Sequence, residues 1–332
     1  MTYPIILAHG ICPFDQIEAG YVAEDNIDGD DDRHYFRKIR SVLQDAGYTV
    51  WHTRVPWAGS VETRALALRA QIEKYLPGEG KFNIIAHSMG GLDARHMVWQ
   101  SVVQKDLFHK RVASVTTIGT PHHGTSFADL LAETVLPKLE KLGPEAVRGL
   151  DLINLLAERS HAVSGLGLGV RFGLVGSPSF DLFKIFPQAE ASGLGGARDL
   201  TRAACLRFNS TVRAVENDLY FGPHETQSNG KILMRTVAGK QFITFIYEPL
   251  KVPSLIIQAM EHQENDGLVP ITSAVWDKRF FLGYLDADHL NEVGWGDDNE
   301  KHLLLGEGPD RMERKIRAFY LDLAQSLPIP ND

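Results

Sequence analysis

A serine held between small residues is the first feature of the chain that could perform chemistry. Ser88 follows the apolar run Phe82–His87 and precedes a helical pattern that starts at Leu92, and Ala86 and Gly90 lie two residues to either side of it. A serine hydroxyl attacks a carbonyl only where a base can reach it, and a tight strand-to-helix turn with small neighbours exposes it in that way. Alanine at position 86 departs from the stricter motif, which has glycine there, by one methyl group. We therefore predict that Ser88 is a catalytic nucleophile.

A carboxylate and an imidazole further along the chain complete a set that could activate this serine. Asp266 follows a predicted strand at residues 254–260, and His289 follows a predicted strand at residues 279–285. Loops after successive parallel strands lie at one edge of a sheet, and Ser, Asp, His is the chain order expected for a nucleophile on such a turn. We predict that His289 takes the proton of Ser88 and that Asp266 orients the imidazole ring.

The 13 histidines offer alternatives to this assignment. His262 precedes the predicted acid, and His302, beside a predicted helix, is the second choice for the base. Asp286 and Asp288 are weaker candidates for the acid, because residues so close in sequence to His289 cannot easily reach around to orient its ring.

The first predicted strand, at residues 3–9, ends in a glycine turn that could supply hydrogen-bond donors. Ester hydrolysis puts negative charge on the former carbonyl oxygen, and a backbone N–H group that meets it contributes about 2.7 to 4 kcal/mol. We assign these N–H groups to Ile11, just beyond Gly10, and to Met89, the residue after the nucleophile. His9 is interpreted as a buried structural histidine, because its place in the chain makes it a poor base.

Alternating strands and helices are expected to position these residues. Apolar runs and helical periodicities alternate up to residue 119, which predicts an α/β fold with a mostly parallel sheet and helices on both faces. Predicted strands cover residues 3–9, 49–55, 82–87, 112–119, 231–238, 254–260 and 279–285, and predicted helices cover residues 35–46, 61–76, 92–104 and 311–327. Between residues 126 and 213 the pattern is helical only, so we expect one domain over residues 1–332 with an inserted helical cap at 126–213.

Charge and cysteine content exclude several classes of function. The 34 Lys and Arg residues against 42 Asp and Glu residues give a net charge of −8 without a basic cluster, so nucleic acid is not an expected partner. Two cysteines exclude a disulfide framework and a four-cysteine zinc site. The acidic run at residues 28–32 fails the calcium-loop spacing, which needs glycine where Arg33 stands and glutamate where Ile39 stands. We predict no metal and no cofactor.

The N-terminus passes from Met1 into an apolar strand without the basic segment and cleavage site of a secretory signal. We therefore expect either a cytoplasmic protein or the mature form of a secreted one. No apolar run reaches the roughly 18 to 20 residues that span a bilayer, so no transmembrane segment is expected.

Five sequence blocks together resemble a known family. They are YPIILAHG at residues 3–10, AHSMGG at 86–91, GTPHHG at 119–124, NDGLV at 265–269 and HLNEV at 289–293. They resemble the bacterial triacylglycerol lipases of the Pseudomonas and Burkholderia type, which belong to the α/β-hydrolase superfamily. The resemblance implies that fold, hydrolysis of acyl esters through an acyl-enzyme, Ser88, Asp266 and His289 as the triad, and Ile11 and Met89 as oxyanion donors. It also implies a small-molecule or lipid ester as substrate and transient contact with a lipid interface.

The same resemblance bears on the cap and on calcium. Members cover the site with a mobile cap, for which residues 126–213 are the counterpart, with residues 152–156 and 166–172 lining an acyl-binding surface; simple packing of these helices is the alternative. Many members also bind a structural calcium through an aspartate two residues beyond the catalytic histidine and through a second carboxylate. Here the first position is Asn291 and the second could be Glu248, so one charge is missing and no ion is predicted.

The leading hypothesis from the sequence is a carboxylesterase or lipase that acts on medium- to long-chain acyl esters. The same three residues could serve acyl transfer, polyester cleavage or amide hydrolysis, and an inactive binding protein could retain the fold. The presence of Ser88, Asp266 and His289 argues against the inactive protein, because a decayed site would be free to lose any of them.

Overall fold

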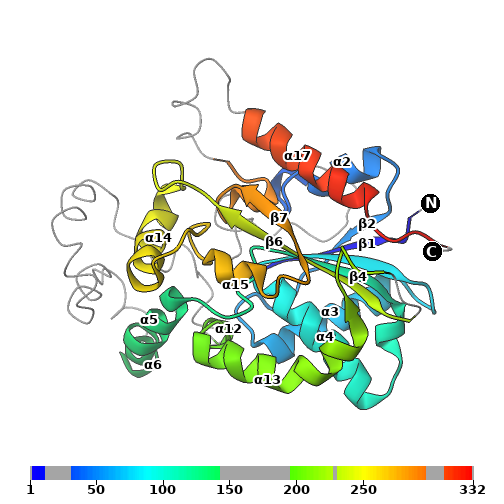
Figure 1. Cartoon of the computed structure of the whole chain (residues 1–332), viewed down its shortest axis with the longest axis horizontal. Coiled ribbons are helices and arrows are strands. Elements are labelled where there is room, and N and C mark those ends of the chain that lie inside the picture. The colour runs from blue at the N-terminus through cyan, green and yellow to red at the C-terminus, as the bar shows by residue number, and fades with distance from the viewer. Residues whose placement is uncertain (1, 12–30, 143–194, 227–229, 297–309, 331–332) are drawn as a thin grey trace.

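A parallel β-sheet with helices on both faces forms the centre of the molecule (Figure 1). The computed structural model describes residues 2–11, 31–142, 195–226, 230–296 and 310–330. Within them the strands are β1 (Ile5–Ala8), β2 (Val50–His52), β3 (Phe82–His87), β4 (Val112–Ile118), β5 (Tyr220–Phe221), β6 (Ile232–Lys240) and β7 (Phe281–Asp286). Their order across the sheet is β2-β1-β3-β4-β6-β5, with β7 also paired to β6, and every pairing is parallel. The predicted mostly parallel arrangement of the sheet is thus confirmed.

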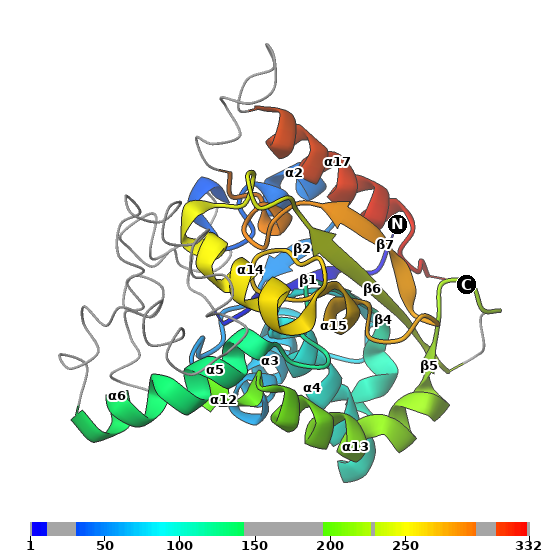
Figure 2. The same ribbon diagram turned by 60° about the vertical axis from the view of Figure 1, so that its left-hand side comes forward.

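Helices cover the two faces of this sheet in two groups. α17 packs against α2 on one face, and α3 packs against α4, with α13 beyond α4, on the other (Figures 1 and 2). The described helices are α2 (Ile39–Asp45), α3 (Val61–Tyr75), α4 (Gly90–Gln104), α5 (Ser126–Thr134), α6 (Leu136–Leu142), α12 (Gly195–Asp199), α13 (Arg202–Leu219), α14 (Glu248–Glu261), α15 (Ile271–Val275) and α17 (Asp310–Gln325), and the 3-10 turns are η1 (Asp31–Arg33), η2 (Phe108–Arg111) and η4 (Asn291–Val293).

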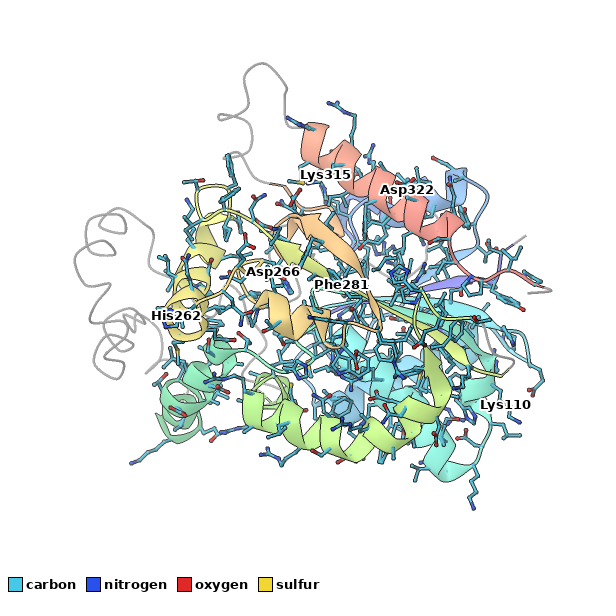
Figure 3. All side chains as sticks on the ribbon, viewed as in Figure 1. Lys110, His262, Asp266, Phe281, Lys315 and Asp322 are labelled. Atoms are coloured by element: carbon cyan, nitrogen blue, oxygen red, sulfur yellow. The ribbon has the colours of Figure 1, made fainter. Side chains whose placement is uncertain are left out.

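The alternation of side chains along each strand divides the core into two parts. On β1, Ile5 and Leu7 pack into one hydrophobic cluster, and Ile6 and Ala8 pack into the other. Side chains fill the space between the sheet and the helices on both sides, while Lys315 and Asp322 lie on the outer helix α17 (Figure 3). β1 and β3, in the middle of the sheet, are buried on both faces and mostly apolar, which is the pattern that made them recognisable in the sequence.

One predicted strand is wrong. Residues 254–260, expected to be a strand before Asp266, lie inside helix α14. Leu250, Ile256 and Ile257 are all buried in the same cluster, and Leu250 is six and seven residues, about two helical turns, before the other two. A short apolar run fits a buried strand and a buried helix equally well, and only the longer pattern that starts at Glu248 distinguishes them. Asp266 therefore follows a helix and not a strand.

The described parts of the predicted cap are helical. α5, α6 and α12 fall within residues 126–213, α13 begins there and continues to Leu219, and α5 packs against both α12 and α14. Residues 152–156 and 166–172 lie outside the described residues, so the acyl-binding surface expected there stays a prediction. No helix among the described residues is long and apolar enough to cross a membrane.

Candidate active site

The turn between β3 and α4 carries Ser88 in a strained backbone conformation. Its φ of 55° lies in the left-handed region, which costs a non-glycine residue roughly 1 to 2 kcal/mol. The surrounding contacts hold it there, since the Ser88 N–H donates to the Ile118 carbonyl at 2.9 Å and the Thr120 hydroxyl donates to the Ser88 carbonyl at 2.7 Å. A methyl group at Gly90 would lie 2.5 Å from the Ala8 carbonyl oxygen. Gly90, two residues after Ser88, thus lets the turn pack directly against β1.

The three residues predicted as a triad lie in one hydrogen-bonded chain. His289 Nε2 is 2.9 Å from Ser88 Oγ, and His289 Nδ1 is 2.8 Å from Asp266 Oδ2. The three side chains are 4%, 2% and 0% exposed for Ser88, His289 and Asp266, so water does not compete for these bonds. A second contact fixes the same pair, because the backbone N–H of His289 donates to the Asp266 carbonyl at 2.8 Å.

Two tight turns present the acid and the base. Asp266 Oδ1 accepts the backbone N–H groups of Leu268 at 2.8 Å and Val269 at 2.7 Å, which closes the loop after α14 around the carboxylate. Beyond β7, Asp288 Oδ1 accepts the N–H groups of Leu290 at 3.0 Å and Asn291 at 2.9 Å and so caps the turn η4. His289 lies between these two turns, and its ring direction follows from them.

The alternative acids and bases lie apart from this chain. Asp286 is on β7 with its side chain 73% exposed and 3.7 Å from Lys315 Nζ. His262 is exposed at the C-terminal end of α14, and His302 lies outside the described residues. Asp288 accepts backbone N–H groups of the turn η4 and does not contact the His289 ring as Asp266 does. The structure therefore brings together the residues preferred from the sequence and not these substitutes.

The N–H groups of Ile11 and Met89 are the two predicted oxyanion donors. Neither the Ile11 nor the Met89 N–H donates to another protein atom among the described residues, although both residues are buried. Buried N–H groups without a partner are rare, and they fit donors that await a ligand. A methyl group at Gly10 would lie 2.6 Å from Ser88 Cβ, so the loop carrying Ile11 runs directly beside the nucleophile.

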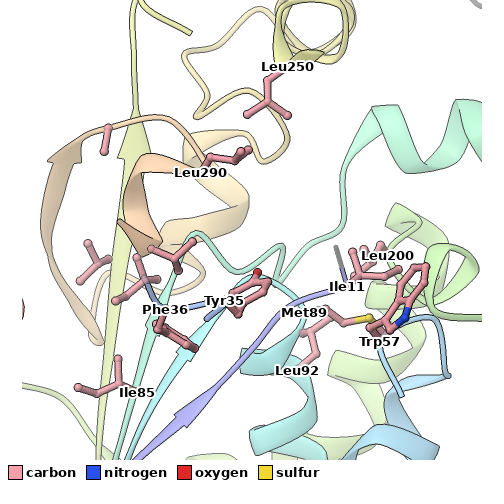
Figure 4. Close-up of a cluster of buried hydrophobic side chains, with 14 of the residues drawn as sticks. Ile11, Tyr35, Phe36, Trp57, Ile85, Met89, Leu92, Leu200, Leu250 and Leu290 are labelled. Carbon is pink, nitrogen blue, oxygen red and sulfur yellow. The ribbon is translucent and has the colours of Figure 1, made fainter. Parts of the chain in front are cut away.

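Helix α12 supports the side chains of these two residues. Ile11 and Met89 belong to a buried cluster with Trp57 and Leu200 (Figure 4). A methyl group at Gly196 would lie 2.7 Å from the Gly59 carbonyl oxygen, 3.0 Å from Ile11 Cδ1 and 3.2 Å from Met89 Cε. The glycine thus lets α12 pack closely against the side chains of Ile11 and Met89.

His9 has the structural role that its place in the chain indicated. Its Nδ1–H donates to the Gly10 carbonyl at 2.8 Å, and its Nε2 accepts the Val55 N–H at 3.0 Å. Burial, reinforced by the positive charge of Arg64, lowers the pKa of His9 to about 3, so the ring is neutral. Because both ring nitrogens are hydrogen-bonded, His9 stabilises the loop that carries Gly10 and Ile11 and is not a base.

A group of buried residues beneath the triad had no role predicted from the sequence. Glu292 is fully buried, with Oε2 2.9 Å from His87 Nε2 and 3.6 Å from His289 Nδ1. His87 Nδ1 is in turn 2.7 Å from the Tyr35 hydroxyl. Burial, reinforced by the nearby carboxylates of Asp266 and Asp288, raises the pKa of Glu292 well above its ordinary value.

Two glycines make room for this acid, and they are the signal that could have revealed it. A methyl group at Gly119 or at Gly239 would collide with the carboxyl oxygens of Glu292. Glu292 also belongs to the block HLNEV that carried the family resemblance. Glycine at the ends of two neighbouring strands indicates a large group packed against them, but the sequence alone does not say which residue fills the space.

The structure gives no support for a calcium ion at Asn291. The amide of this residue donates to the Trp295 carbonyl at 2.8 Å and its oxygen accepts the Asp288 N–H at 3.3 Å, so both ends serve the local turn. Donor atoms of His87, His289 and Glu292 lie within 4.8 Å of one another, but the hydrogen bonds above already use them.

Comparisons with known proteins find lipases among the relatives of the chain. The chain is 30% identical to a triacylglycerol lipase of Vibrio cholerae over 88% of its own length and 79% of that protein, and 27% identical to one of Burkholderia plantarii over 88% and 78%. A yeast protein, triacylglycerol lipase 2, is 32% identical over 39% of this chain, which corresponds to about half (49%) of the length of that relative. No protein-family model matches the chain.

Solved structures show the same fold at low sequence identity. Lipase 1 from Pelosinus fermentans superimposes with a TM-score of 0.58 over 98% of this chain and 99% of that one, at 18% identity. EstA from Clostridium botulinum gives a TM-score of 0.57 over 98% and 87%, at 17% identity. With the sequence relatives, these likenesses show that the chain belongs to the triacylglycerol lipase family and is a lipase-like carboxylic ester hydrolase of the α/β-hydrolase fold.

Proposed function

We propose that the chain hydrolyses lipid esters with medium or long acyl chains, such as triacylglycerols, through an acyl-enzyme formed on Ser88. The observation that supports this most is the chain of hydrogen bonds from Asp266 through His289 to Ser88, at 2.8 and 2.9 Å, with a positive φ at the serine. This geometry suits attack on a carbonyl carbon. The lipid class of the substrate rests on the relatives named triacylglycerol lipase.

The first step forms the acyl-enzyme. His289 Nε2 removes the proton of Ser88 as Oγ bonds to the carbonyl carbon, and the imidazolium then gives this proton to the departing alcohol oxygen. Asp266 Oδ2 holds the hydrogen on His289 Nδ1, which leaves Nε2 as the acceptor. In the second step water attacks the acyl carbon, His289 takes its proton, and the proton returns to Ser88 as the fatty acid leaves.

The oxyanion of both tetrahedral intermediates is assigned to the N–H groups of Ile11 and Met89. Removal of one such donor from a hydrolase site costs on the order of 10²- to 10³-fold in kcat. The helix α4 adds to this stabilisation, because its N-terminal end begins at Gly90, directly after Met89.

The single domain and its cap are part of the same proposal. We assign residues 126–213 as a helical insertion that covers the acyl-binding side of the site in a domain spanning residues 1–332. The support is that α5 packs on α14, the helix that leads to Asp266, and that α12 packs on Ile11 and Met89. Helices of the insertion thus touch both the acid side and the oxyanion side of the nucleophile.

A series of p-nitrophenyl esters of increasing chain length tests the function. We expect activity to peak at medium or long chains and to vanish in Ser88→Ala. Ser210→Ala, which removes an exposed hydroxyl on α13, is the matched control and should behave as the wild type. Full activity in Ser88→Ala would refute the nucleophile, and a peak at acetate would replace the lipase by a short-chain esterase.

A further inference from the structure

The peptide group that joins Ser88 to Met89 carries one of the two assigned oxyanion donors at its nitrogen. Its carbonyl oxygen belongs to Ser88 and its N–H group belongs to Met89. The described residues contain no cis peptide bond, so this group is trans, and its N–H and C=O bonds point in opposite directions. A contact that fixes the direction of the Ser88 carbonyl therefore also fixes the direction of the Met89 N–H.

The hydroxyl of Thr120 makes the shorter of two hydrogen bonds to this carbonyl. It donates to the Ser88 oxygen at 2.7 Å, whereas the Gly91 N–H, in the first turn of α4, donates to the same oxygen at 3.1 Å. The Thr120 side chain is fully buried, so water does not compete for its bond. At the other end of the peptide group, the Met89 N–H donates to no protein atom among the described residues. One end of the group is thus held, and the other is available to a ligand.

The local sequence makes Thr120 a rigid anchor. It is β-branched, which restricts its χ1 angle, and it precedes Pro121, which restricts its backbone to extended conformations. The His122 N–H donates to the Thr120 carbonyl at 2.8 Å and closes the turn after β4. A methyl group at Gly91 would overlap Thr120 Oγ1 and lie 2.7 Å from Thr120 Cγ2. The missing side chain at Gly91 thus leaves the room in which the hydroxyl reaches the carbonyl.

The backbone conformation of Ser88 makes such an anchor necessary. Its φ of 55° is unfavourable for a serine, so neighbouring groups must hold the turn. Residues at the end of β4 hold it at both ends, because the Ile118 carbonyl accepts the Ser88 N–H at 2.9 Å and the Thr120 hydroxyl binds the Ser88 carbonyl. Without that hydroxyl, only the longer bond from Gly91 opposes rotation of the next peptide group. This rotation turns the Met89 N–H away but leaves the Cα–Cβ bond of Ser88 in place.

We propose that Thr120 is a positioning residue for the oxyanion site, because its hydroxyl holds the Ser88 carbonyl and so directs the Met89 N–H at the oxygen of the tetrahedral adduct. The proposal rests on the proposed function, since it names a residue that acts on one of the assigned donors. No bond is made or broken at Thr120, and its hydrogen remains on the hydroxyl throughout. The same hydrogen bond polarises the peptide group, which makes the Met89 N–H a stronger donor.

Removal of the Thr120 hydroxyl at nearly constant shape is the first test. In Thr120→Val we expect kcat for p-nitrophenyl octanoate to fall by about tenfold with little change in KM, because a misdirected donor forfeits part of what a donor contributes to the rate. Thr120→Ser keeps the hydroxyl and should recover most of the kcat. Thr236→Val is the matched control and should keep the wild-type kcat, since it also removes a buried hydroxyl, one that donates to the Val275 carbonyl at 2.9 Å.

The outcomes of this test separate the proposal from the function beneath it. With Ser88→Ala inactive, a wild-type kcat in Thr120→Val would overturn the positioning role. A Thr120→Ser variant as slow as Thr120→Val would also overturn it, because the effect would then come from the methyl group and not from the hydroxyl. Activity retained in Ser88→Ala would instead overturn the function on which the proposal rests.

NMR of a single amide group reports on the donor itself. Ser88 and Met89 form the only Ser–Met pair in the sequence, so carbonyl carbon-13 in serine and nitrogen-15 in methionine together select the Met89 N–H. Octylboronic acid adds to Ser88 Oγ as a tetrahedral anion, with the serine proton on His289, and should move the Met89 proton resonance downfield. In Thr120→Val it should bind about tenfold more weakly and move this resonance less. Equal affinity and equal displacement in the two proteins would overturn the proposal.

Discussion

The guanidinium of Arg64 lies 2.8 Å from the carboxylate of Asp93, and neither side chain is more than 1% exposed. Arg64, on α3, also donates to the His9 carbonyl at 2.7 Å, and Asp93 is in the first turn of α4. One buried ion pair thus connects the loop after β1 with the helix that follows the nucleophile. The two proposed oxyanion donors come from these two segments, so the pair fixes the distance between them.

Removal of the cation alone should lower the free energy of unfolding much more than removal of both charges of this pair. In Arg64→Met the Asp93 carboxylate stays buried without its cation, and we expect the free energy of unfolding to fall by about 3 to 5 kcal/mol. Adding Asp93→Leu removes the charge and should restore most of the loss. Urea unfolding of the wild type and both variants at pH 7 measures this. A loss under about 1 kcal/mol in Arg64→Met would place the pair with ordinary surface ion pairs.

The acid of the proposed triad can be tested without disturbing its loop. In Asp266→Asn the amide oxygen can still accept the Leu268 and Val269 N–H groups, but the side chain no longer fixes the hydrogen on His289 Nδ1. We expect kcat to fall by about 10²- to 10⁴-fold, with an unchanged thermal unfolding midpoint. Asp286→Asn, at an exposed carboxylate, is the control. Equal activity in the two variants would remove Asp266 from the triad.

The sequence predicted the parts of this site that depend on local pattern. The strand before Ser88 and the helix after it are continuous apolar and periodic segments, and the turn between them requires small residues whatever the rest of the chain does. The predicted chain order of acid and base agrees with where the structure puts Asp266 and His289, although α14 replaces the strand expected before Asp266. The predicted order of acid and base is unaffected by the wrong strand, because it depends on the loops that carry Asp266 and His289 and not on the elements before these loops.

The contacts beneath the triad could not be predicted in the same way. His87 and Glu292 are 205 residues apart, and Tyr35 and His87 are 52 residues apart. A histidine before the nucleophile and an acid after the base have no local periodicity that links them. Their pairing follows from which strands are neighbours in the sheet and from the space left by Gly119 and Gly239, and both need the folded chain.

Close packing of α12 on the oxyanion loop gives a prediction with an adjacent control. In Gly196→Ala the new methyl group meets the Gly59 carbonyl at 2.7 Å, so α12 must move away from Ile11 and Met89. Displaced donors should lower kcat by about tenfold to 10²-fold, because small shifts in a site are costly. In Gly195→Ala the methyl group meets nothing closer than 3.6 Å, and kcat should be unchanged. Equal kcat values for the two variants would show that α12 does not position the donors.

The protonated state of Glu292 predicts how stability changes with pH. Its pKa is raised in the folded protein above the ordinary value of 4.5. Below that value Glu292 is protonated in both states; above it the unfolded chain releases the proton and the folded chain keeps it. Folding stability from this group is therefore lost as pH rises from 4.5 toward the raised value, by about 1.4 kcal/mol per pH unit.

Glu292→Gln isolates this contribution, because Asp266, Asp288, His87 and His289 face the same position in both proteins. The difference in unfolding free energy between variant and wild type should shift in favour of the variant above pH 4.5, at about 1.4 kcal/mol per pH unit. Urea unfolding between pH 4 and pH 8 gives this difference directly. If the wild type instead gained stability relative to the variant as pH rose, Glu292 would be an ionised partner of His87, and the hydrogen bond between them would run from the imidazole to the carboxylate.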